Sequence, residues 1–168
     1  MFKKVVLFFV FAFCLFGVNN AMSAPTFEGK YYDWNVYSLE DKDGNKVCYI
    51  ATFSKETKGN YNGKRNPYLM ITYFKAKEKE EVSVFADFIY KKNSTIRMAI
   101  DKNQFKLLTK DKMAWAKSSQ DDEKMIEYLM KSEEIKVRSE TNKNEYTIDF
   151  YSGKGFATAY NKMKLICK

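Results

Sequence analysis

The chain of 168 residues contains no histidine. This absence excludes triads and dyads that use an imidazole as general base, and it removes the commonest protein ligand for zinc. No G-x-S-x-G nucleophile elbow occurs either. A pair of carboxylates is the remaining route to hydrolysis; Asp87, Asp149 and Glu127 are candidates, but no motif selects them. The sequence therefore predicts a protein that is not an enzyme and that holds no metal ion and no cofactor.

Cysteine is almost as scarce, with three residues in the chain. Cys14 lies inside the apolar N-terminal run, behind a bulky phenylalanine, which is not the pattern of a lipoprotein signal. The other two, Cys48 and Cys167, stand near opposite ends of the remaining sequence. In an exported protein they are expected to form one long-range disulfide, which could stabilise the fold by at most about 4–5 kcal/mol. The alternative is two buried free thiols.

The first residues have the three parts of a secretory signal peptide. Lys3 and Lys4 precede an apolar run over residues 5–18, and small residues follow. The alternative is an uncleaved anchor, but the run is shorter than the roughly 18–20 residues that cross a bilayer. We therefore expect residues 1–23 to be removed, and the protein to lie in the periplasm, in the envelope or outside the cell.

Cleavage is expected after Ser23, because Ala21 and Ser23 place small side chains at positions −3 and −1. Cleavage after Ala21 is nearly as favourable, whereas cleavage after Ala24 would put Pro25 beside the scissile bond. The rest, residues 24–168, has the length of a single domain. No segment of it is long and apolar enough to be a transmembrane helix.

Positive charge is in excess, and very little of it is arginine. The formal net charge is +8, or +6 without Lys3 and Lys4, and the arginines are Arg65, Arg97 and Arg138. Lysine suits bidentate phosphate recognition less well than arginine does. Two interpretations stay open: a solvated surface, or attraction to anionic lipid or glycan. Nucleic acid is not an expected partner of an exported protein.

Most of the chain has the pattern of closely spaced strands joined by polar turns, which is typical of a sandwich or barrel. The nearly continuous apolar run 68–74 predicts a central strand that is buried on both faces. The polar stretch 54–66 is expected to be a long loop. The expected strands are residues 32–37, 47–53, 68–74, 82–89, 96–100, 105–108, 113–116, 135–138 and 146–151.

Two helices are expected among the strands. The first has a capping box that begins at Ser119, and a stripe over residues 125–130 that should face the core. In the second, Phe156, Tyr160, Met163 and Cys167 share one face, which places the Cys167 sulfur on the buried side. The predicted fold is therefore mainly β, an antiparallel β-sandwich with two appended α-helices, one of them C-terminal.

A partner could meet the long loop and the strand that follows it. Tyr61, Lys64, Arg65 and Tyr68 combine aromatic and basic side chains there. Ordinary packing of the loop is the favoured alternative, because scattered aromatic residues need no functional explanation.

An ordered set of segments resembles the invasion-associated locus B family of exported bacterial proteins. The segments are D-W-N-V-Y (33–37), K-V-C-Y (46–49), R-N-P-Y-L-M-I-T (65–72), E-E-V-S-V (80–84), F-K-L-L-T (105–109), A-W (114–115), Y-L-M-K (128–131), D-F-Y-S (149–152), G-F-A-T-A (155–159) and the terminal cysteine. The order and spacing together carry the resemblance, which covers the chain after the leader.

This resemblance implies an immunoglobulin-like β-sandwich with appended helices in the periplasm or envelope, and no enzymatic activity. It also implies a role in host-cell invasion in some pathogens, through an unknown envelope or host-surface partner. The chain departs from the family at Asp87-Phe88, where Gly-Tyr is usual, and in the segment 139–144. If that segment contacts a partner, the partner of this protein differs.

Overall fold

The computed structural model describes residues 23–168. The leader predicted for residues 1–23 lies, except for Ser23, outside the described residues, and its cleavage stays a prediction. Neither described helix has the length and hydrophobicity of a membrane-spanning segment. The fold is mainly antiparallel β-sheet with two α-helices, the second of which is C-terminal, as predicted.

The strands form one continuous sheet with the order β1-β2-β3-β5-β6-β9-β8-β7-β10-β11-β4. Each neighbouring pair in it is antiparallel. The strands are β1 (Thr26–Tyr31), β2 (Trp34–Glu40), β3 (Lys46–Phe53), β4 (Glu56–Gly59), β5 (Tyr68–Phe74), β6 (Lys79–Phe85), β7 (Thr95–Ile100), β8 (Asn103–Lys110), β9 (Met113–Ala116), β10 (Glu134–Glu140) and β11 (Tyr146–Ser152). A short 3₁₀ helix, η1, spans Lys75–Lys77.

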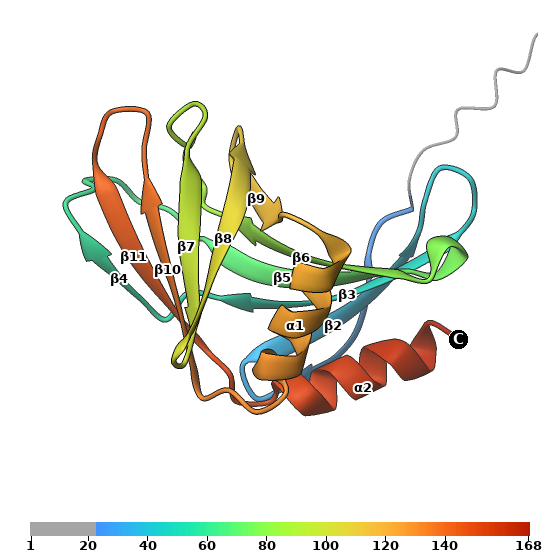
Figure 1. Cartoon of the computed structure of the whole chain (residues 1–168). Helices are drawn as coiled ribbons and strands as arrows, with labels where there is room; N and C mark the ends of the chain where they lie inside the picture. Colours follow the sequence, from blue (N-terminus) through green and yellow to red (C-terminus); the bar gives the residue numbers. More distant parts are fainter. Residues whose placement is uncertain (1–22) are drawn as a thin grey trace, which may run out of the picture.

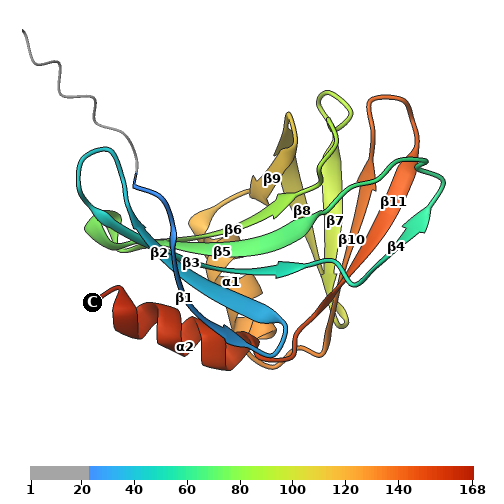
Figure 2. The ribbon, with the colours of Figure 1, turned by 180° about the vertical axis from the view of Figure 1, so that it is seen from behind.

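The two layers of the predicted sandwich are the two halves of this bent sheet (Figures 1 and 2). Strands β1, β2, β3, β5 and β6 make one half, and β7, β8, β10 and β11 stand across from it. Alternate residues of both halves point into the shared core. Fully buried examples are Ile50 and Ile71 from the first half and Met98 and Val137 from the second.

Helix α1 (Ser119–Leu129) lies beside the strands around β6. Its N-cap is Ser118, one residue before the predicted position, and the Ser118 hydroxyl accepts a hydrogen bond of 3.2 Å from the Asp121 amide. The cap satisfies one of the amides that have no partner within the helix. Met125 and Leu129 are buried in the core, as the apolar stripe predicted.

Helix α2 (Phe156–Ile166) closes the open side of the first half of the sheet, against β1, β2 and β3 (Figure 1). The Phe156 ring meets the Trp34 indole edge to face, with centroids 5.0 Å apart. The Trp34 indole N–H donates to the Ser152 carbonyl at 3.0 Å, so the buried tryptophan has a polar partner.

Four expectations for the strands need correction. The strand expected over 82–89 is β6, which ends at Phe85. β1 was not predicted, and neither was β4, which occupies part of the expected loop 54–66 and pairs with β11. β5 lies centrally, between β3 and β6. It is buried on one face only, because Tyr68 and Met70 are partly exposed on the other.

Candidate binding surfaces

The predicted disulfide between Cys48 and Cys167 is present, with Cα atoms 6.0 Å apart. Cys48 lies on β3, and Cys167 follows the last turn of α2. Both residues are fully buried. The bond therefore ties the C-terminal helix to an inner strand, and its role is structural.

The four residues suspected of partner contact do not form one surface. Tyr61 is partly buried and packs against the core, with its ring centroid 5.5 Å from that of Phe88. The Arg65 side chain points inward and is only 3% exposed. Lys64 is exposed, and Tyr68 is partly exposed on β5. Loop packing thus accounts for Tyr61 and Arg65, while contact of Lys64 or Tyr68 with a partner stays a prediction.

Arg65 belongs to a polar cluster in the interior. Its guanidinium pairs with the Asp149 carboxylate and donates to the Ala86 carbonyl at 2.9 Å. The same guanidinium lies 5.2 Å above the centre of the Phe88 ring. Because the Asp149 side chain is 1% exposed, the pair is closed to a substrate from outside.

The carboxylates considered for hydrolysis lie in three different surroundings. Asp149 is held by Arg65, and Asp87 lies 3.4 Å from the Lys112 ammonium at the surface. Glu127 is on the exposed side of α1. Within residues 23–168, no three His, Cys, Asp or Glu side chains are placed to hold a metal ion. The geometry supplies no reason to assign hydrolysis to these acids.

The outer face of the first half of the sheet carries a group of half-exposed side chains, all of them aromatic except one methionine. We call it the aromatic surface; it comprises Tyr37, Tyr49, Phe53, Tyr68, Met70 and Phe85. These residues alternate with core residues along β2, β3, β5 and β6, so they point away from the core. Figure 2 shows β2, β3 and β5 in front of α1, with this face uncovered by that helix.

The rings of the aromatic surface are paired across strands. Tyr37 and Tyr49 stand opposite one another, and so do Tyr68 and Phe85. In each pair the rings stack, with centroids 4.9 Å apart and interplanar angles of 18° and 20°. Phe53 meets the Tyr68 ring edge to face at 6.0 Å. The surface is therefore an organised cross-strand arrangement, of the kind that stabilises a sheet.

A shallow cavity of about 430 Å³ opens on this surface. It is lined by Pro25, Tyr37, Tyr49, Ala51, Phe53, Tyr68 and Met70. Partial burial raises the pKa of Tyr49 and of Tyr68, with Asp87 adding to the rise for Tyr68. Both phenols are protonated at physiological pH, as an ordinary tyrosine is, and can act as hydrogen-bond donors at this surface.

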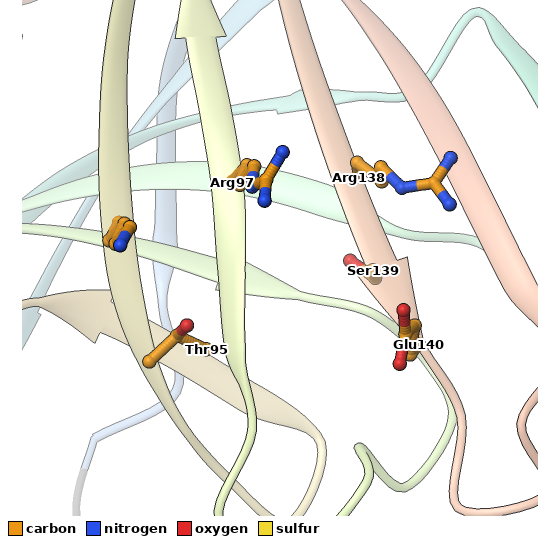
Figure 3. Close-up of a pocket in the computed structure, with 6 residues that line it drawn as sticks. Thr95, Arg97, Arg138, Ser139 and Glu140 are labelled. Atoms are coloured by element: carbon orange, nitrogen blue, oxygen red, sulfur yellow. The ribbon is translucent and has the colours of Figure 1, made fainter.

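The second half of the sheet carries a different pocket on its own outer face, which we call the arginine pocket. It has a volume of about 470 Å³. Figure 3 shows Arg97 on β7 and Arg138 on the neighbouring strand β10. Its lining residues are Thr95, Arg97, Lys106, Arg138, Ser139 and Glu140. The sequence shows that arginine is rare, but it does not indicate that Arg97 and Arg138 lie side by side.

Comparison with known proteins identifies the family and the fold. The sequence model described as "Invasion associated locus B (IalB) protein" matches residues 34–164. The crystal structure of invasion associated protein b from Bartonella henselae superposes with a TM-score of 0.58 at 13% identity, covering 86% of this chain and 98% of that one. At this identity the likeness concerns the fold alone. A search of curated proteins gives no match.

Proposed function

Because the chain belongs to the invasion associated locus B family, we propose that it is an exported, non-enzymatic envelope protein that acts by binding. The signal-peptide pattern and the buried disulfide support export, since disulfides persist in oxidising compartments. In a pathogen, the binding partner would belong to the envelope or to the host surface, and the contact would contribute to host-cell invasion.

The aromatic surface is the observation that carries this proposal. The outer face of a sheet can carry polar side chains, because it does not pack against the core. On the aromatic surface these outward positions are instead occupied by Tyr, Phe and Met. These residue types are enriched at protein–protein interfaces. Phe53, at 43% exposure, is one of the large apolar side chains left open to solvent. A clustered aromatic patch around a cavity marks an interaction site better than scattered residues do.

The geometry favours a protein partner over a sugar or a lipid. Within the stacked pairs one face of each ring is already occupied by its neighbour, so the ring edges and the phenol groups contribute much of what a partner would meet. Ring edges are the positive part of the aromatic quadrupole, and phenols donate hydrogen bonds. Backbone carbonyls and aliphatic side chains of a protein match that chemistry.

The partner can be sought with a photo-crosslinking amino acid placed at Phe53 in the exporting cell. Tyr128 is the matched control position, because it is similarly exposed, at 41%, but lies on α1, away from the aromatic surface. We expect a discrete protein adduct from position 53 and not from position 128. Adducts with lipid or glycan alone, or no adduct at position 53, would contradict the proposal.

The purified partner then allows a quantitative test. Phe53→Ser should weaken its binding by at least about tenfold, as for a central interface residue, while Tyr128→Ser should leave the affinity unchanged. Equal losses in both variants would show that the aromatic surface is not the interface.

Export and invasion need separate measurements. Cell fractionation should place the protein outside the cytosol, and mass spectrometry should find Ala24 at its N-terminus. If the role concerns invasion, deletion of the gene should reduce host-cell entry while the integrity of the envelope is kept. A protein found only in the cytosol, with residues 1–23 attached, would overturn the proposed function.

A further inference from the structure

Three cations stand side by side across the second half of the sheet. Arg97 on β7 lies directly opposite Lys106 on β8 and directly opposite Arg138 on β10. Directly opposite residues of an antiparallel pair have Cβ atoms about 4.5–5.5 Å apart, and like charges at these positions destabilise the sheet. This row of three cations, Arg97, Lys106 and Arg138, therefore destabilises the unliganded protein. Its presence is better explained by binding of an anion than by folding.

The three cations of this row are not neutralised by acidic side chains of the described residues. No ion pair found among residues 23–168 includes Arg97, Lys106 or Arg138. Glu140 is the acidic residue of the pocket, and its carboxylate lies 3.9 Å from Lys91. The Arg138 guanidinium is 4.7 Å above the Tyr146 ring, which restricts its orientation.

The use of arginine at this place is selective. Only three of the 29 basic residues of the chain are arginines. Arg65 forms the buried ion pair with Asp149. The other two, Arg97 and Arg138, are exposed and lie directly opposite one another on neighbouring strands. A planar guanidinium binds oxyanions in a bidentate manner that lysine cannot reproduce. Lysine would have sufficed for solubility alone.

We propose that the arginine pocket binds a phosphate or sulfate group carried on a saccharide, with Arg97 and Arg138 as bidentate donors and Lys106 as a third cation. The volume of about 470 Å³ is many times the roughly 30 Å³ that one water molecule occupies in the liquid. A bare oxyanion would thus fill only part of it. Thr95 and Glu140 can hydrogen-bond to sugar hydroxyls, and none of the lining residues is apolar.

This site is separate from the aromatic surface, because it lies on β7, β8 and β10. The site is tested by calorimetric titration of the exported, disulfide-bonded protein with a sulfated heparin tetrasaccharide, glucose 6-phosphate, glucose and inorganic phosphate. We expect one saccharide per protein, with the charged saccharides binding more tightly than glucose or phosphate. Vesicles of phosphatidylglycerol are titrated in parallel, and binding to vesicles without binding to any saccharide would overturn the proposal.

Variants separate a built site from general positive charge. Arg97→Gln with Arg138→Gln should weaken saccharide binding by at least about tenfold. Lys75→Gln with Lys77→Gln removes the same charge from the exposed η1 turn and should change it less than about twofold. The charge-conserving pair Arg97→Lys and Arg138→Lys should give an intermediate loss. Equal losses in the glutamine pairs, or no saccharide binding by the unmodified protein, would refute the site.

Folding of the variants is checked by thermal unfolding. The Arg97→Gln and Arg138→Gln protein should unfold at the same temperature as the unmodified protein or higher, since like charges are removed from opposite positions. Adding the tetrasaccharide should raise the unfolding temperature of the unmodified protein and not that of this variant. Phe53→Ser should keep the full effect, so that failure of this site and failure of the proposed protein interface can be distinguished.

Discussion

The guanidinium of Arg65 and the carboxylate of Asp149 form a buried ion pair between residues 84 positions apart in the sequence. The pair joins the loop that precedes β5 to the middle of β11, which lies in the other half of the sheet. Thr57 on β4 donates a hydrogen bond of 2.7 Å to the same carboxylate. The ion pair thus connects the two halves where the sheet ends at β4.

Removal of one partner of this pair should be strongly destabilising. Arg65→Met leaves the Asp149 charge buried without its cation, and we expect a loss of about 3–5 kcal/mol in the free energy of unfolding at pH 7. Lys55→Met is the control, because the Lys55 side chain is 53% exposed in its pair with Asp33, and that pair should contribute less than about 1 kcal/mol. Urea unfolding measures both.

A double-mutant cycle isolates the pair itself. Arg65→Met combined with Asp149→Asn should lose less than the sum of the single losses, because no buried charge is then left alone. Strictly additive losses would show that the two side chains do not interact in solution.

The disulfide should stabilise the whole domain, because it holds α2 against β3. Replacing Cys48 and Cys167 together by serine should lower the free energy of unfolding by about 2–5 kcal/mol. Reduction of the unmodified protein should reproduce this loss, while the same reductant should not affect the serine variant. Circular dichroism during urea unfolding provides the measurement, and an unchanged midpoint after complete reduction would contradict it.

The elements that sequence patterns predicted well are those whose burial depends on local periodicity. The apolar faces of α1 and α2, and the alternating strands β7, β10 and β11, are in the predicted places. β4 was missed because Glu56–Gly59 is polar and exposed, and only backbone pairing with β11 defines it. β1 was missed because Gly29 interrupts its alternation at a change of register.

The candidate surfaces were harder to predict, for two physical reasons. The apolar run Tyr68–Phe74 suggested burial on both faces, because hydrophobicity alone does not reveal that one face has no covering layer. The proximity of Arg97 and Arg138 depends on the pairing of β7 with β10, two strands that are distant in sequence. Hydrophobic patterns do not specify which strands become neighbours in a sheet. By contrast, the disulfide followed from the number of cysteines and the expected compartment.

Gly155 should be essential for the start of α2. Its φ is +94°, and an added Cβ would lie 2.2 Å from the Tyr31 carbonyl oxygen. Gly155→Ala therefore combines backbone strain with a clash against β1, and we expect a loss of at least about 1–3 kcal/mol. Gly44→Ala is a matched control with φ of +77° and nothing within 4 Å of the added atom. A larger loss at Gly155 than at Gly44, measured by urea unfolding, would isolate the clash, and equal losses would exclude it.

The stability of the protein should fall as pH rises through the titration of Asp122. Its carboxylate is buried in the first turn of α1, where it accepts the Val82 N–H at 2.7 Å. Burial raises its pKa from 3.8 to about 6, in spite of that hydrogen bond. Between these values the folded protein binds more protons than the unfolded chain, so the free energy of unfolding decreases as pH increases. Above pH 6 the folded state carries the full cost of a buried carboxylate.

Asp122→Asn should remove this pH dependence. The amide oxygen can still accept the Val82 N–H, while no charge is buried, so the variant should be more stable than the unmodified protein by about 1–3 kcal/mol at pH 7.5. At pH 3.5 most of the advantage should disappear, because the carboxyl group is then protonated in the folded state and mostly protonated in the unfolded chain. Urea unfolding at pH 3.5, 5, 6 and 7.5 measures the difference. Asp121→Asn, on the same helical turn, is the control for loss of an acidic side chain near the helix N-terminus and should give no stabilisation at pH 7.5. An advantage of Asp122→Asn that stays constant across this range would contradict the raised pKa.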